Sequence, residues 1–192
     1  MDAAFEKFVE HGLEQAGMRE IIRKSGGSYS TVYRWFGSKD GLFIAAIEHK
    51  MKKLSLDFEN IAKERKDAPI EECLKAFALK LLDVIFDEKF ILVFQRILNA
   101  GLRKDPKFGC MLKETATKGH MLVLANYVKA QQEKGALREG DPFAAAARFV
   151  GCVKDPRHIH AIITGKREAM DSAQRETIAQ EAARFFLYGF SA

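Results

Sequence analysis

The sequence predicts an all-α protein of nine or ten helices, with a small N-terminal head joined to a larger helical body. Apolar residues recur at helical spacing through every long segment, and no alternating, strand-like pattern persists. Only four prolines interrupt the 192 residues. We place the head at residues 1–47 and the body at residues 48–192.

The first helix is predicted by Phe5, Phe8 and Val9, which form an apolar stripe at i, i+3 and i+4. Because glycine disfavours the interior of a helix, Gly12 and then Gly17 are expected to end it. The head therefore starts with one amphipathic helix that buries a phenylalanine-containing face.

Two short helices follow, separated by the glycine pair at 26–27. One spans 19–25, and the other runs from Ser28, a hydroxyl N-cap, to about Phe36 with Val32 on its inner side. Two short helices joined by a tight glycine turn form a helix-turn-helix, whose second helix lies in the major groove of DNA. The head is thus a candidate DNA-binding domain.

The remaining helices are predicted from caps, apolar stripes and breakers. Ser38 should cap a long helix over about 40–62, and Asp141 followed by Pro142 is a strong helix start. Pro156 should kink or break the helix that begins there. The other body helices are expected over 70–86, 89–103, 106–134 and 172–189.

Four polar side chains in and beside the predicted recognition helix can contact phosphates. The hydroxyls of Ser28 and Thr31, together with the open N–H groups at the helix start, can bind phosphate oxygens. Tyr33 can extend its hydroxyl to the DNA backbone, and Lys39 can neutralise a further phosphate. Such contacts would position the helix on double-stranded DNA without reading its sequence.

Base readout is assigned to Arg34 and Arg19, with Tyr29 and Ser30 beside them. Arg34 can form the bidentate pair with guanine that is the commonest specific contact. Tyr29 and Ser30 lie at the N-terminal end of the helix, where side chains reach base edges. Trp35, by contrast, is expected to pack against the first helix at the edge of the core.

The distribution of charge agrees with this use of the head. The chain has a formal net charge of +5, which permits an anionic partner. Residues 19–39 hold five basic residues and one acidic residue, net +4, whereas residues 1–14 hold one basic and four acidic residues, net −3. Positive charge is therefore concentrated around the predicted recognition helix.

Several other classes of protein are disfavoured. No run approaches the roughly 18 apolar residues of a membrane span, and the acidic N-terminus is unlike a signal peptide, so we expect a cytoplasmic protein with no membrane partner. Three widely spaced cysteines imply reduced thiols. His158 and His160 near Cys152 do not have the spacing of metal ligands, so no metal is expected. No nucleophilic side chain lies at a meaningful spacing from a general base, so no catalytic residue or cofactor is expected either.

A fixed pattern of glycines, hydroxyls and apolar residues runs through residues 3–47. Its members are Phe8, Gly12, Met18, Arg19, Ile21, Gly26, Ser28, Thr31, Tyr33, Phe36, Ser38, Lys39 and Leu42. This pattern resembles the DNA-binding domain of TetR-family transcriptional regulators. Residues 135–153 and 182–190 are similar, less closely, to the ligand-binding and dimerising body of AcrR/AefR-like members. The resemblance implies a homodimeric one-component repressor that binds double-stranded operator DNA and releases it when an effector shifts the long helix.

The effector is predicted to be a small apolar molecule bound in the body. The middle helices are rich in phenylalanine and methionine, which favours a cavity of about 300–1,000 Å³ among them. The predicted lining residues are Phe77, Leu81, Phe94, Leu98, Phe108, Met111, Met121 and Phe149.

Dimerisation is predicted through the helix that starts at Pro142 and the last helix, because they carry more apolar side chains than one domain edge usually exposes. Two such helix pairs can form a four-helix interface around a two-fold axis. The alternative is that these side chains close the core of a monomer. The predicted contact residues are Phe149, Val153, Phe185, Phe186, Tyr188 and Phe190.

Two other functions remain open from the sequence. The protein could be a helical small-molecule carrier or enzyme whose helix-turn-helix is only architectural. It could also be a module that binds another protein through its last two helices. Salt-dependent binding to double-stranded DNA separates the regulator from the carrier or enzyme. A symmetric homodimer argues against the protein-binding module.

Overall fold

The computed structural model describes the backbone of residues 1–100, 106–166 and 169–192, and their side chains apart from those of 96–100, 106–109, 111–113 and 115–118. These residues form ten α-helices, which confirms the predicted all-α class, and the one extended pairing among them is an isolated bridge between Leu137 and Ser191. The helices are α1 (Asp2–Gln15), α2 (Met18–Ser25), α3 (Tyr29–Phe36), α4 (Lys39–Glu64), α5 (Ile70–Ile85), α6 (Glu88–Ala100), α7 (Pro106–Glu133), α8 (Pro142–Lys154), α9 (Arg157–Thr164) and α10 (Ser172–Phe190).

Side-chain caps explain where several helices begin. Ser28 and Ser38 each accept a hydrogen bond from the backbone N–H three residues later, at 3.2 and 3.0 Å, as their predicted N-cap roles require. The carboxylate of Asp141 accepts two backbone hydrogen bonds at 2.8 and 3.2 Å, and Pro142 occupies the first turn of α8. These helix starts follow from residues that are neighbours in sequence.

Two predicted breakers act differently from each other. Gly12 adopts φ 74° and interrupts the helical geometry, but the chain returns to a helical turn that ends at Gln15. Pro156 separates two helices instead of bending one, since α8 ends at Lys154 and α9 begins at Arg157. The proline therefore turns one predicted segment into two distinct helices.

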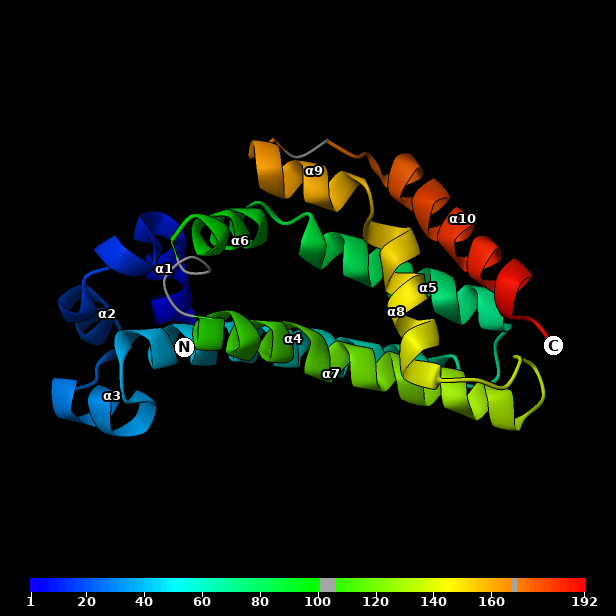
Figure 1. The fold of residues 1–192 in the computed structure, drawn as a ribbon, viewed down its shortest axis with the longest axis horizontal. Helices are drawn as coiled ribbons and strands as arrows, with labels where there is room; N and C mark the ends of the chain where they lie inside the picture. Colours follow the sequence, from blue (N-terminus) through cyan, green and yellow to red (C-terminus); the bar gives the residue numbers. More distant parts are fainter. Residues whose placement is uncertain (101–105, 167–168) are drawn as a thin grey trace.

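Figure 1 shows an elongated arrangement, with α1, α2 and α3 at one end and the C-terminus at the other. α4 and α7 pack side by side along the long axis, and α5 packs against α10 on the other side of the body. α8 contacts α5, α7 and α10, so it connects these two pairs. α6 contacts α1 and α9, which brings the body into direct contact with the head.

α4 takes part in two hydrophobic clusters. From Leu42 to Met51 its buried side chains pack with α1, α2 and α3, and with Val93 of α6. From Leu54 onward, including the fully buried Phe58, it packs into the body. One continuous helix thus joins the core of the head to the core of the body, and the head cluster extends along it as far as Met51.

α4 and α7 approach closely where Gly119 faces Ser55. A Cβ atom at position 119 would lie 2.2 Å from Ser55 Oγ, so a larger residue requires movement. Ser55 is buried, and its hydroxyl donates a hydrogen bond to the Met51 carbonyl at 3.0 Å. The absence of a side chain at Gly119 therefore sets how near the two long helices lie.

Candidate nucleic-acid interface and effector region

α3 presents most of its surface to solvent. Val32 is its one buried residue, and Phe36 is half-buried one turn later. Tyr29, Tyr33 and Trp35 are 42%, 47% and 71% exposed. A short helix that exposes three large aromatic side chains is available for contact with another molecule.

Three hydroxyls gather at the N-terminus of α3. Ser28 Oγ lies 3.0 Å from Ser30 Oγ and 2.9 Å from Thr31 Oγ1. Behind them the rings of Tyr29 and Tyr33 stack, with centroids 6.4 Å apart and planes 12° from parallel. Since a helix N-terminus also carries unpaired N–H donors and a partial positive charge, this end of α3 suits an anion such as phosphate.

Arg19 and Arg34, the residues predicted to read bases, are both exposed. The described part of the chain gives neither of them an ion pair. Arg23 and Lys24 are exposed on the same helix as Arg19. Their charges are therefore available to a partner.

Lys39 has an internal contact that the sequence did not predict. Its Nζ donates a hydrogen bond to the Glu14 carbonyl at 2.7 Å, and its side chain is half-buried. This contact ties the start of α4 to the end of α1. A phosphate contact by Lys39 would have to share an ammonium group that already has a structural role.

Trp35 differs from the expectation that it packs against the first helix. Val32 and Phe36 occupy the inner side of α3, one turn apart, and Trp35 lies outside that stripe with 71% of its surface exposed. The expectation that the indole faces the first helix was wrong because position 35 lies outside the inner stripe of α3. Trp35 is therefore an additional candidate for contact with DNA.

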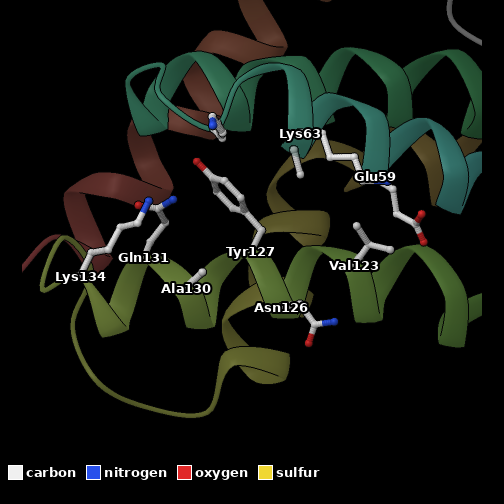
Figure 2. Close-up of a pocket in the computed structure, with 10 residues that line it drawn as sticks. Glu59, Lys63, Val123, Asn126, Tyr127, Ala130, Gln131 and Lys134 are labelled. Carbon is white, nitrogen blue, oxygen red and sulfur yellow. The ribbon is translucent and has the colours of Figure 1, made fainter.

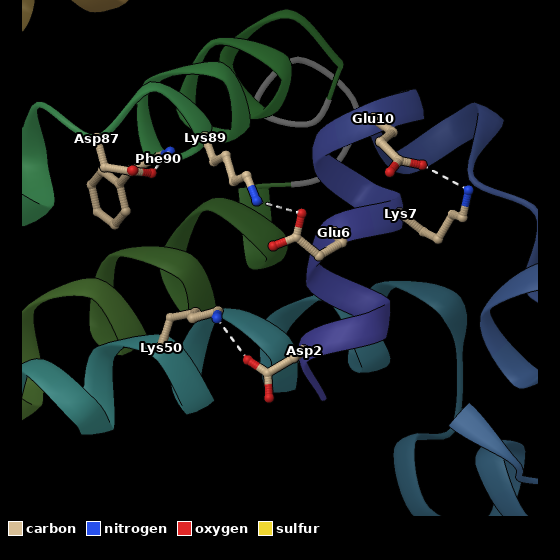
Figure 3. Close-up of polar contacts among 8 residues, drawn as sticks. All are labelled: Asp2, Glu6, Lys7, Glu10, Lys50, Asp87, Lys89 and Phe90. Carbon is tan, nitrogen blue, oxygen red and sulfur yellow. Dashed lines mark hydrogen bonds and ion pairs between the residues drawn. The ribbon is translucent and has the colours of Figure 1, made fainter. Parts of the chain in front are cut away.

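Two ion pairs join the head to the body around α1. Lys50 of α4 contacts Asp2 at 2.6 Å, and Lys89 of α6 contacts Glu6 at 2.7 Å (Figure 3). The hydrogen bond and charge of Lys50 lower the pKa of the Asp2 carboxyl. The Lys50 ammonium also lies 5.1 Å from the centre of the Phe5 ring, a cation–π contact. α1 is thus attached to two different helices of the body.

The predicted effector-binding residues are mostly packed in the core. Four of them are at most 5% exposed: Phe77, Leu81, Met121 and Phe149. The ring centroid of Phe77 lies 4.9 Å from that of Phe58. Phe94 is half-buried and its ring lies 4.7 Å from that of Phe90. The side chains of Leu98, Phe108 and Met111 lie outside the described residues, so the effector-binding cavity stays a prediction.

The burial of two histidines was not predicted from the sequence. His120 and His158 are 7% and 8% exposed, and the His120 Nδ1 and His158 Nε2 atoms have no hydrogen-bond partner among the described residues. Burial lowers the pKa of each imidazole to about 4, so both are neutral near pH 7. Their rings lie near aromatic side chains, Phe58 for His120 and Phe86 and Phe94 for His158. Histidines scattered along a sequence carry no signal that would have predicted this.

The predicted dimer residues fall into two groups. Phe149, Val153 and Phe186 are at most 2% exposed within one chain, and the Phe149 and Phe186 rings meet at 5.6 Å between α8 and α10. These three close the monomer core, which corrects the expectation that they face a partner. Phe185 and Tyr188 are 70% and 91% exposed, and Phe190 is half-buried.

Two other features bear on function. No helix among the described residues is long and apolar enough to span a bilayer. The same residues contain no group of three His, Cys, Asp or Glu side chains suited to a metal ion. His158 is buried whereas His160 is exposed, so the two imidazoles near Cys152 face different surroundings.

Two family models match most of the chain. Residues 1–46 match the model of bacterial regulatory proteins of the tetR family. Residues 72–192 match the model of the C-terminal domain of AefR-like transcriptional repressors. The first match contains α1, α2 and α3, and the second begins within α5.

Individual relatives agree with these models. The HTH-type transcriptional regulator SrpR and the uncharacterised HTH-type regulator TtgW, both from Pseudomonas putida, are each 30% identical over 107 residues, or 53% of this chain. The match spans 47% of SrpR, about half of its length, and 75% of TtgW. A crystal structure of a TetR-family regulator from Mesorhizobium loti covers 100% of this chain and 94% of its own, with a TM-score of 0.85 at 24% identity.

The fold, the exposed third helix and the two family matches lead to one assignment. The chain belongs to the TetR family of transcriptional regulators, with a DNA-binding helix-turn-helix at its N-terminus and an AefR-like C-terminal domain.

Proposed function

We propose that this regulator binds operator DNA as a homodimer and represses transcription until a small apolar effector releases it. Residues 1–47 would bind DNA, and residues 48–192 would bind the effector and dimerise. The observation that carries the proposal is α3, an exposed helix with three hydroxyls at its N-terminus. Arg19 and Arg34 are exposed nearby and form no ion pair with the described residues.

The proposal divides the contacts into two kinds. Ser28, Thr31 and Tyr33 contact phosphates, because their hydroxyls lie on an exposed helix whose N-terminus favours anions. Arg34 and Arg19 read base edges, with Tyr29 and Ser30 beside them. Trp35 joins the first kind, since its exposed indole can pack along the sugar-phosphate backbone.

Dimerisation would use the side chains of α8 and α10 that remain exposed. Phe143, Phe185 and Tyr188 are 46%, 70% and 91% exposed, which is unusual for large apolar residues on the two helices concerned. A two-fold pair would present two copies of α3 to half-sites about 34–36 Å apart. A small change in the separation of the heads would then prevent both from binding at once.

The effector would bind in the body near the buried aromatic side chains. The unpartnered nitrogens of His120 and His158 support this, because a buried polar atom without a partner favours a ligand that supplies one. An apolar effector with a hydrogen-bonding group would satisfy such a nitrogen. The partly exposed head–body ion pairs offer a route by which a shift in α4 or α6 reaches α1.

The test compares Arg34→Ala with the wild type on a selected operator and on a scrambled duplex at two salt concentrations. Arg34→Ala should reduce the binding free energy by about 1–3 kcal/mol on the operator and by much less on the scrambled duplex. Lys129→Ala removes the same charge from α7, far along the body, and should leave both affinities unchanged. An equal loss on both duplexes would end the base-readout role of Arg34, and wild-type affinity that does not fall with salt would end the DNA-binding proposal.

Dimerisation is tested by sedimentation of the wild type and of Tyr188→Glu. The wild type should sediment at twice the chain mass of 21.6 kDa at micromolar concentration. Tyr188→Glu places a charge at an exposed site and should shift the population toward monomer without lowering the melting temperature. A wild-type monomer would contradict the proposal.

A further inference from the structure

A hollow of about 550 Å³ lies between the C-terminal halves of α4 and α7, away from the head. It is bordered from α4 and the turn after it by Glu59, Ala62, Lys63 and Lys66, and from α7 and the turn after it by Val123, Asn126, Tyr127, Ala130, Gln131 and Lys134. Its volume falls in the range of small-molecule sites, about 300–1,000 Å³. Lys63, Lys66, Asn126 and Lys134 are exposed, so the hollow opens to solvent.

The floor of the hollow is apolar. Two small side chains line it, Ala62 from α4 and Ala130 from α7, and Val123 lies one turn before Tyr127 on α7. Tyr127 is 8% exposed, and its ring packs edge-on against that of Phe77 with the centroids 5.3 Å apart, so the ring is held in place. A ligand therefore meets a fixed aromatic ring flanked by methyl groups.

One polar side chain at the hollow has no partner. Gln131 is 8% exposed, and the described residues supply its side-chain amide with no hydrogen bond. Figure 2 shows the side chains of Tyr127, Gln131 and Lys134 rising from the same side of α7. The Gln131 amide atoms are not among the fully buried, unpaired side-chain atoms of the described residues, so they remain accessible from the hollow and offer a ligand one donor group and one acceptor.

The rim carries an excess of positive charge. Lys63, Lys66 and Lys134 border the hollow against one carboxylate, that of Glu59. Lys66 has a contact of 3.9 Å with Asp67, whereas Lys63 and Lys134 form no ion pair with any described residue. The ends of helices favour lysine through the helix dipole, but that effect explains neither the hollow nor the unpartnered amide.

We propose that this hollow binds an amphipathic anion, with its alkyl or aryl part on the alanine and tyrosine floor and its acidic head group between Lys63 and Lys134. Gln131 donates a hydrogen bond to the same head group. The site lies on the solvent side of the α4–α7 seam, so it is separate from the cavity predicted inside the body. A carboxylate and a phosphate monoester share the chemistry that the lysines recognise.

The experiment is calorimetric titration of the full-length wild type with decanoate and with decyl phosphate, with decanol and acetate as half-ligands. Saturable binding of at least one of the two anions is expected, with decanol and acetate at least about tenfold weaker, because each lacks one half of the contacts. The ratio of the affinities for decanoate and decyl phosphate distinguishes a carboxylate ligand from a phosphate ligand. Binding of neither anion would overturn the proposal.

Variants locate the site. The double variant Lys63→Gln, Lys134→Gln should bind the anion about tenfold or more weakly than the wild type. Ala130→Trp should abolish binding, because the indole fills the apolar part of the hollow. Lys52→Gln, an exposed lysine of α4 outside the hollow, is the matched control and should bind as the wild type does. Wild-type affinity in both the lysine pair and Ala130→Trp would mean that the anion binds elsewhere and would overturn the proposal. No DNA is present, so either result leaves the operator-binding proposal to its own test.

Discussion

α3 in the head and the α4–α5–α7 core of the body are both rich in aromatic side chains, yet they use them in opposite ways. Tyr29, Tyr33 and Trp35 are exposed on α3, whereas Phe58 and Phe77 are fully buried with their rings 4.9 Å apart. Tyrosine and tryptophan carry a polar end that tolerates water or binds a partner, and phenylalanine does not. The difference shows that aromatic content alone does not indicate burial; the polar end of the ring and its position on the helix decide.

The largest expected effect separates these two regions directly. Phe77→Ala removes a fully buried ring that contacts Phe58 and Tyr127, so it should lower the free energy of unfolding by about 3–5 kcal/mol. Trp35→Ala should change it by less than about 0.5 kcal/mol while weakening DNA binding. Urea denaturation and DNA titration of both variants provide the measurement. Comparable destabilisation by the two substitutions would remove the contrast.

The buried histidines make the body sensitive to pH. The pKa of His120 and the pKa of His158 are both lowered from 6.5 to about 4. Burial is the cause for His120; for His158 burial is the largest cause, with the charge of Lys154 lowering the pKa and that of Asp155 raising it. Between pH 6.5 and pH 4 these two imidazoles bind protons in the unfolded chain and stay neutral in the folded chain. The free energy of unfolding should therefore fall as pH drops from 6.5 to 4, by at most about 1.4 kcal/mol per pH unit for each imidazole.

Denaturation at a series of pH values checks this, with His120→Phe and His158→Phe as the comparison. Each substitution should flatten the curve between pH 6.5 and 4, because one titrating group is removed. A double variant with the same slope as the wild type would show that other groups cause the pH dependence.

Glycine positions test the α4–α7 contact. Gly119→Ala would place its Cβ 2.2 Å from Ser55 Oγ in a buried contact, so it should destabilise the protein by about 1–3 kcal/mol. Gly151→Ala in α8 meets nothing within 4 Å, so it should stabilise by up to about 1 kcal/mol through helix propensity. Adding Ser55→Ala to Gly119→Ala should restore part of the loss. Thermal melts of the three variants and the wild type measure the order of their stabilities, and equal melting temperatures for the two single glycine variants would contradict the close contact.

The smallest effect is expected at the junction between the two regions. Asp2 is an exposed partner of Lys50, so Asp2→Asn should cost roughly 0.2–1 kcal/mol. The pKa of Asp2 is lowered in the folded chain, mainly by its hydrogen bond with Lys50, so its contribution is present above the ordinary value of 3.8 and lost as pH falls below it. Denaturation at pH 7 and pH 2 measures the difference between variant and wild type, which should vanish at the lower pH. A difference that persists at pH 2 would exclude the carboxylate charge as its cause.

Local features of the structure were predictable because their causes are neighbours in sequence. The caps at Ser28, Ser38 and Asp141 each bond to N–H groups two or three residues away, and the sequence places both partners. The stripe of Phe5, Phe8 and Val9 likewise predicted one buried face of α1, and all three are buried. Helix starts and apolar faces therefore followed from short-range chemistry.

The covering of those faces was not predictable in the same way. The stripe of α8 and α10 that contains Phe149, Val153 and Phe186 suits a partner chain as well as it suits the monomer core, and periodicity does not distinguish these two environments. Trp35 and Lys39 show the same limit for single residues. An indole expected to be covered is exposed, and an ammonium expected to be free donates to the Glu14 carbonyl.

By itself the sequence determined the helical class, the caps, the helix-turn-helix and the concentration of positive charge around it, because each depends on residue types at fixed short spacing. The tertiary structure alone decided which apolar face packs on which helix, and it placed Lys63 and Lys134, 71 positions apart in the numbering, at one hollow. It also buried His120, His158 and Gln131, whose hydrogen-bonding atoms depend on neighbours from distant helices. Burial is a property of the assembled helices, so residue order along the chain cannot supply it.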